Sequence, residues 1–162
     1  MMQYEYRVTK YDPRNRDEKG VYTVDEWIMF SQVGSVVGGK QLTMEEYQRT
    51  EDAYIAAAVS FLKESGSQSV AVRQLEDTQG EAKNLSVREG CILDHEQAAS
   101  LMRLVLRGLA WCKLESENGY VHFGWDYYMF IAVPIRCDSS REFASRQGLH
   151  VENCPSPHGD RS

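Results

Sequence analysis

The chain has 162 residues, of which 42% are hydrophobic and 26% are charged, a composition typical of a globular domain rather than of a disordered segment. Its net charge of -6 argues against a protein that binds the phosphate backbone of nucleic acid, because such binding needs a cationic surface. The first residues do not resemble a signal peptide and no run of eighteen apolar residues occurs. We therefore expect a cytoplasmic protein without a membrane partner.

One domain over residues 1–162 is expected from this length, with a flexible tail from about residue 154 to residue 162. The four cysteines and four histidines show no C-x-x-C, H-x-x-x-H or H-E-x-x-H spacing. Glycines at 34, 38 and 39 lack the Lys-Ser/Thr pair of a phosphate-binding loop. The sequence thus predicts free thiols, no metal and no cofactor.

The N-terminal segment is predicted to be a strand. Residues 2–9 place Met, Tyr, Tyr and Val at every second position, which is the period of a half-buried strand. The sequence Tyr11-Asp12-Pro13 ends this strand, and the charged residues 14–20 are expected to form an exposed loop.

Two weaker elements are predicted next. Residues 26–30 are short and rich in aromatic and branched side chains, which favours a strand, although Thr23 and Glu26 also fit a helix capping box. A short helix over 31–37 would end at the glycine pair that follows it.

The clearest helix signal starts at Thr43, which forms a T-x-x-E capping box with Glu46. Apolar residues follow at spacings of three, four and seven: Tyr47, Tyr54, Ala58, Phe61 and Leu62. This helix is expected to end at Ser65-Gly66, and residues 69–75 are predicted to return as a strand.

Residues 76–90 form a polar segment that is expected to contain a short strand at 85–87. A second long helix is predicted to begin at Asp94, which forms a capping box with Gln97. Its expected buried stripe is Ala98, Leu101, Met102, Val105 and Leu109.

A hairpin follows, because Asn118-Gly119 is a strong signal for a two-residue turn with positive φ. Its strands are predicted over 111–116 and 120–133. The expected register pairs Leu114 with Phe123, Cys112 with Trp125, and Ser116 with Val121, so that the indole faces the helices.

Pro134 should close the sheet, followed by a short helix over 139–147 and a last strand over 149–153. This order of elements predicts an α+β fold in which a single, mostly antiparallel sheet is packed by two long helices.

The densest group of reactive side chains lies on the predicted strand 120–133. His122, Asp126 and Tyr128 alternate with apolar residues, and Glu115 is expected opposite His122 in the hairpin. A carboxylate beside an imidazole can orient a general base or raise the pKa of the histidine. The alternative is a strand covered on both faces, in which these polar groups bond to nearby backbone and Gly124 marks a bulge.

An acidic surface is the second candidate site. Glu45, Glu46, Glu51 and Asp52 lie on the first half of the long helix. Such a cluster would speed the capture of a basic protein partner by electrostatic steering. Alternatively, the acids stabilise the helix dipole and keep the chain soluble.

Several stretches together resemble a family of small bacterial proteins, and the most specific of them is Val121-His122-Phe123-Gly124-Trp125-Asp126-Tyr127-Tyr128-Met129, the VHFGxDYYM motif. The other stretches are residues 6–13, the Asp25-Glu26-Trp27 step, and Leu42-Thr43 with Glu46-Tyr47. This family is similar to immunity proteins that accompany polymorphic or contact-dependent toxins. The resemblance implies an antidote that binds a toxin domain and occludes its active site, but it assigns no interface residue.

We therefore expect a non-enzymatic, protein-binding immunity protein whose partner is a basic toxin domain, with no nucleic acid involved. The alternative is a small enzyme or ligand-binding domain that uses the strand face of His122, Asp126 and Tyr128 together with Glu115. A third hypothesis, a regulatory or structural subunit, predicts an exposed apolar patch and self-association.

Overall fold

The computed structural model describes residues 3–158. The predicted place of Met2 in the first strand and the end of the predicted tail, residues 159–162, lie outside the described residues. The elements, in chain order, are β1 (Tyr4–Thr9), η1 (Pro13–Asn15), η2 (Phe30–Gln32), β2 (Val36–Val37), β3 (Lys40–Gln41), α1 (Met44–Glu64), β4 (Val70–Glu76), α2 (Glu81–Asn84), β5 (Ile92–Leu93), α3 (His95–Leu106), β6 (Trp111–Ser116), β7 (Gly119–Phe123), η3 (Trp125–Tyr127), β8 (Met129–Val133), α4 (Asp138–Arg146) and β9 (His150–Asn153).

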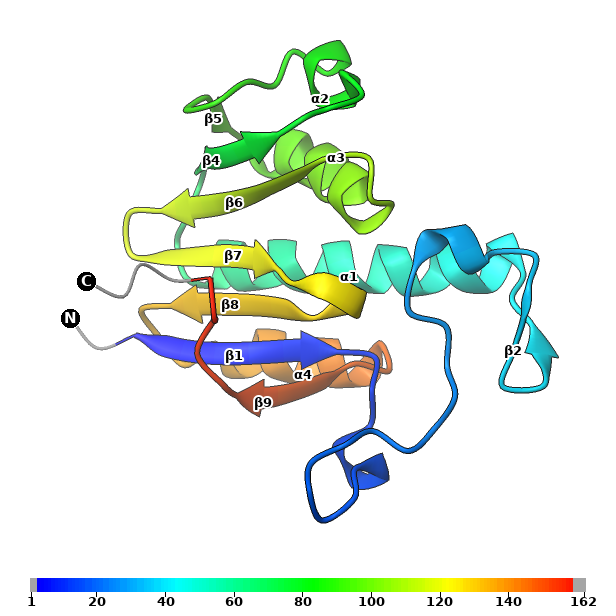
Figure 1. The fold of residues 1–162 in the computed structure, drawn as a ribbon. Coiled ribbons are helices and arrows are strands. Elements are labelled where there is room, and N and C mark those ends of the chain that lie inside the picture. Colours follow the sequence, from blue (N-terminus) through cyan, green and yellow to red (C-terminus); the bar gives the residue numbers. More distant parts are fainter. Residues whose placement is uncertain (1–2, 159–162) are drawn as a thin grey trace.

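Seven strands form one sheet in the order β5-β4-β6-β7-β8-β1-β9, and each pair of neighbours is antiparallel. The helices α1, α3 and α4 lie against one face of this sheet (Figure 1). The predicted α+β fold with a mostly antiparallel sheet is therefore confirmed. Among residues 3–158, no helix is both long and apolar enough to cross a membrane.

The two long helices start where the capping signals predict. The Thr43 hydroxyl accepts a hydrogen bond from the Glu46 amide at the start of α1. At α3, Asp94 and Gln97 satisfy each other's backbone amides, so a complete capping box is present. These bonds occupy amides that have no partner within the helix, which fixes the first turn.

The core lies between the helices and the covered sheet face. Its largest fully buried side chains include Tyr6, Tyr47, Tyr54, Phe61, Leu101, Met102, Leu114, Met129 and Ile131. The aromatic and aliphatic stripes predicted for α1 and α3 supply most of the helix side, as their spacing requires. Leu109 is the exception, because it follows the end of α3 and is only half-buried.

The predicted strand 120–133 is wrong, because the chain turns back within it. The strand β7 ends at Phe123, a tight turn follows, and β8 pairs with β7 from Met129 onward. The hairpin register also differs from the prediction, since Leu114 pairs with Val121 and Ser116 with Gly119. The partners have moved by two residues, so each side chain keeps its face but gains a different neighbour.

Gly119 serves a purpose other than the predicted positive-φ turn. Neither Asn118 nor Gly119 has a positive φ. A Cβ on Gly119 would lie 2.1 Å from the carbonyl oxygen of Ala132. The glycine therefore permits the close approach of β8 to the start of β7.

Three shorter predictions are also wrong. Residues 26–30 form no strand, although Trp27 joins the core with 8% of its surface exposed. Residues 31–37 form η2 and then β2, and the glycine pair is the turn of the β2–β3 hairpin rather than a helix end. The excursion over 76–90 holds the short helix α2 instead of a strand at 85–87.

Candidate functional site

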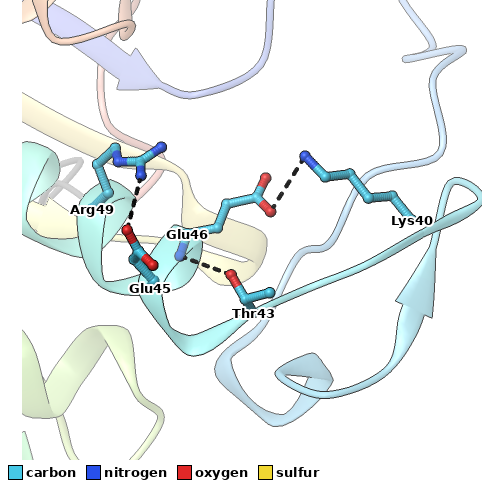
Figure 2. Close-up of a pocket in the computed structure, with 5 residues that line it drawn as sticks. All are labelled: Lys40, Thr43, Glu45, Glu46 and Arg49. Carbon is cyan, nitrogen blue, oxygen red and sulfur yellow. Dashed lines mark hydrogen bonds and ion pairs between the residues drawn. The ribbon is translucent and has the colours of Figure 1, made fainter.

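The first turn of α1 carries Glu45 and Glu46, the first two residues of the predicted acidic surface. Figure 2 shows them beside two cations: Glu45 lies 3.6 Å from Arg49, and Glu46 lies 3.8 Å from Lys40. These four side chains and Thr43 line a shallow hollow of about 260 Å³. Both signs of charge therefore alternate here, which weakens any long-range field from the carboxylates.

Glu51 does not lie on the predicted acidic surface, because its side chain is fully buried between α1 and α3. Arg107 donates to both carboxylate oxygens at 2.8 and 3.0 Å, and Arg103 forms a second ion pair with Glu51. Tyr47 donates its hydroxyl hydrogen at 2.6 Å. Asp52 stays exposed and accepts from Arg103 at 3.0 Å. Glu51 therefore holds the two helices together.

The polar network around Glu51 continues into the β7–β8 turn. The hydroxyl of Tyr127 contacts that of Tyr47 and donates to the carbonyl oxygen of Leu106 at 2.7 Å. Burial, followed by the hydrogen bond with Glu51, raises the pKa of Tyr47 far above its usual value. The Tyr47 phenol therefore stays protonated, and its contact with Tyr127 connects α1 to the turn.

The expected pairing of Glu115 with His122 is wrong. The observed register places Tyr120 opposite Glu115 and Lys113 opposite His122. The His122 imidazole is 2% exposed and stacks on the Tyr120 ring, with ring centres 4.0 Å apart. Burial, then the charge of Lys113 and then His158, lower the pKa of His122 to about 3, the opposite of the expected rise.

His122 also separates from the other members of its predicted row. Asp126 lies in the turn after β7, is exposed, and has a φ of 62°. Tyr128 packs its ring on Tyr11, at 5.4 Å between ring centres, and below the guanidinium of Arg7. The structure therefore does not bring His122, Asp126 and Tyr128 onto one strand face.

The predicted position of Trp125 is wrong, and this error matters most for the function of the protein. The prediction paired it with Cys112 in the core, yet its side chain is 86% exposed at the tip of the β7–β8 turn. An uninterrupted strand over 120–133 exceeds the usual length of about 3–10 residues, and Gly124 lies inside it. That combination was the available signal for a turn.

The turn that presents Trp125 is held by several hydrogen bonds. The Gly124 amide donates to the carbonyl of Tyr128 at 2.7 Å. The hydroxyls of Tyr11 and Tyr54 donate to the carbonyls of Asp126 and Tyr127 at 2.5 and 2.8 Å. Asp126 and Tyr127 both have positive φ, which costs about 1–2 kcal/mol each and persists only where the surroundings enforce it. The turn is therefore one fixed conformation with an indole on its tip.

Comparisons with protein-family models, with curated proteins and with solved structures found no match for this chain. Its proposed function rests on the geometry of the described residues.

Proposed function

We propose that this chain is a non-enzymatic protein-binding protein, an immunity protein that neutralises a bacterial toxin domain by occluding its active site. The observation that carries the proposal is the exposed Trp125 on a fixed turn. Tryptophan is enriched among the few residues that dominate binding energy at protein interfaces, because one side chain buries a large apolar area. A solvated indole at this level of exposure is a surface that a partner can cover.

The rigidity of the turn supports this function. Binding costs free energy when loops and side chains must be ordered, and a turn that is already fixed avoids most of that cost. The hydroxyls of Tyr11 and Tyr54, together with the amide of Gly124, hold the turn before any partner arrives. The same bonds keep Asp126 and Tyr127 at positive φ, in a turn that leaves Trp125 exposed.

The negative net charge of the chain favours a positively charged partner. A net charge of -6 favours encounter with a basic protein, and Asp126, the residue that follows Trp125 in the chain, is also exposed. We propose a basic toxin domain that covers the turn over about 800 Å² on each partner, the usual size of a stable interface. The cytoplasm is the proposed site of this encounter.

Co-expression with the product of the neighbouring gene tests the proposal. We expect the full chain to abolish the toxicity of that product and to co-purify with it at equal stoichiometry. Trp125→Ala is expected to weaken binding by about thirtyfold or more, which corresponds to the 2 kcal/mol or more of a dominant interface residue. Calorimetric titration of the purified pair measures this change.

Ile92→Ala is the matched control, because Ile92 is 63% exposed on β5 at the far edge of the sheet. Its affinity should equal that of the wild-type chain. A neighbouring product that is neither bound nor neutralised by the wild-type chain would overturn the proposed function. Equal affinities of Trp125→Ala and wild type would remove Trp125 as the anchor.

A further inference from the structure

The segment that follows β9, residues 154–158, lies across the sheet face that the helices leave open. In Figure 1 it rises from β9 past β1 and β8 toward β7, on the side opposite to α1 and α4. We call this segment the strap. Ser156 in its middle is only 5% exposed, so the strap is packed on the sheet.

Three backbone amides attach the strap to the sheet or to itself. Cys154 donates to the carbonyl of Glu5 at 3.0 Å, and Ser156 donates to the hydroxyl of Tyr120 at 3.1 Å. The amide of His158 donates to the Ser156 hydroxyl at 3.0 Å. These amides are therefore direct reporters of whether the strap is closed.

Two imidazoles lie close together where the strap crosses β7: that of His122 is buried, and that of His158 is half-buried. Nδ1 of His122 lies 2.9 Å from the Ser156 hydroxyl, and its buried Nε2 has no hydrogen-bond partner within residues 3–158. The His158 ring covers Phe130 and the edge of Trp111, with ring centres 6.2 and 5.8 Å away. The two imidazole rings are 6.5 Å apart.

The charged and titratable groups around His122 do not favour a cation there. Lys113 comes from β6 and is 7% exposed, and His158 comes from the strap. Tyr120 on β7 stacks on the imidazole and donates its hydroxyl hydrogen to Glu5 on β1. The remaining groups near this face are Arg7 on β1, which forms an ion pair with Glu152 on β9 at 3.3 Å, and the thiol of Cys154. Glu115 on β6 lies opposite Tyr120.

The carboxylates on this face are those of Glu5, Glu115 and Glu152. Glu5 accepts from Tyr120 and Glu152 pairs with Arg7 and Arg16, and within residues 3–158 none of the three bonds to an imidazole. A proton on His122 would therefore be enclosed with the charge of Lys113 and beside His158. Enclosed like charges are costly because little water screens them.

We propose that the strap is an acid-operated cover: protonation of His122 and His158 releases residues 154–158 from the sheet and uncovers the face around Phe130. The inference is independent of the toxin-binding proposal, since it concerns contacts within one chain.

The direction of the pH effect follows from the surroundings of the histidines. Burial, then Lys113 and His158, lower the pKa of His122 from 6.5 to about 3, and burial followed by Lys113 lowers that of His158. When the strap opens, both rings regain water and bind a proton more readily. The neutral histidines therefore contribute their full stabilisation of the closed strap above pH 6.5. This stabilisation decreases as the pH falls from 6.5 toward about 3.

Amide hydrogen exchange of the full chain, followed by NMR between pH 7.5 and 5, tests the strap. After correction for intrinsic exchange, His122 alone should lower the protection of the Ser156 and His158 amides by about thirtyfold at pH 5, because each pH unit below 6.5 changes the equilibrium about tenfold. The amides of Val121 and Ile131 in the sheet should keep their protection, which separates local release from global unfolding.

His122→Asn supplies the matched variant. The amide of asparagine can still bond to Ser156 near the position of Nδ1, but it binds no proton in this range. We expect most of the pH dependence to disappear in this variant and all of it to disappear in His122→Asn/His158→Asn. His150→Asn on β9 is the control and should respond like wild type.

Strap protection that stays constant from pH 7.5 to 5 would overturn the proposal, as would an equal loss of protection in the sheet. Should the asparagine variant fail to fold, the ring protons of wild-type His122 decide the matter by NMR titration. A midpoint well below 6.5 supports the strap, and a midpoint at or above 6.5 contradicts it.

Discussion

Glu51 shows how one carboxylate can join two helices. Its side chain is fully buried and receives bonds from Arg103, Arg107 and Tyr47. A buried charge is tolerated only when partners compensate its loss of water, and each of these partners in turn depends on Glu51.

Removing this carboxylate should therefore destabilise the fold. We expect Glu51→Ala to lower the free energy of unfolding by about 3 kcal/mol, the lower part of the usual range because Arg103 and Arg107 retain some contact with water. Urea denaturation measures the change. Glu45→Ala is the control, since its side chain is 88% exposed, and it should change stability by no more than about 0.5 kcal/mol. A loss below about 1 kcal/mol for Glu51→Ala would contradict the structural role.

The burial of Glu51 had a signal in the sequence. Glu51 lies four residues after Tyr47 and four before Ile55, within the apolar stripe of α1. A charged residue inside such a stripe indicates a buried pair, but the partners, Arg103 in the last turn of α3 and Arg107 at its C-cap, lie more than fifty residues later in the chain. Spacing within one helix cannot identify these arginines, so sequence alone places Glu51 on the surface with Glu45, Glu46 and Asp52.

At the scale of elements, the β2–β3 hairpin depends on one of its two glycines more than on the other. Gly38 and Gly39 both have positive φ, at 59° and 78°. A Cβ on Gly38 would lie 2.3 Å from the carbonyl oxygen of Asp25, whereas a Cβ on Gly39 would meet nothing within 4 Å. The backbone near Asp25 would have to move in the first case only.

The two alanine variants should therefore differ. Gly39→Ala is expected to cost about 1 kcal/mol through its left-handed backbone alone. Gly38→Ala should cost about 1–3 kcal/mol more, because the added methyl group overlaps backbone atoms that cannot rotate away. Thermal and urea denaturation of both variants provide the comparison. Equal losses of stability in the two variants would contradict this prediction and would mean that the backbone around Asp25 can move at little cost.

Elements with local signals could be predicted, and those that depend on distant contacts could not. The capping residues Thr43 and Asp94 act within a single turn of helix, so sequence alone located both helix starts. The β7–β8 turn has no such signal, because Asp126 and Tyr127 hold positive φ through bonds from Tyr11 and Tyr54. The exposure of Trp125 follows from that turn and was missed with it.

For the whole molecule, the buried phenols predict sensitivity to alkali. Five phenols are each at most 6% exposed, and burial is the first cause that raises the pKa of each: Tyr6, Tyr11, Tyr47, Tyr54 and Tyr127. The folded chain therefore keeps these protons at a pH where the unfolded chain has released them. Their contribution to stability is complete below pH 10 and decreases as the pH rises above 10.

We expect each buried phenol to lower the free energy of unfolding by about 1.4 kcal/mol per pH unit above 10. Unfolding should then occur within about two pH units, given the usual stability of about 5–15 kcal/mol. Phenolate absorbance at alkaline pH, followed together with circular dichroism, measures this. Five of the nine tyrosines should ionise only as the helical signal disappears. Ionisation of all nine near pH 10 in a folded chain would contradict the buried network.

The position of β1 in the sheet has a consequence for synthesis on the ribosome. This strand is synthesised before the other strands of the sheet, yet it hydrogen-bonds between β8 and β9, which are synthesised after them. While the chain elongates, β1 cannot pair with either neighbouring strand, so Tyr6 and Val8, which are buried in the folded protein, remain exposed to solvent. Closing so long a loop is slow, so the nascent chain stays open to chaperones until residues 129–153 have left the exit tunnel.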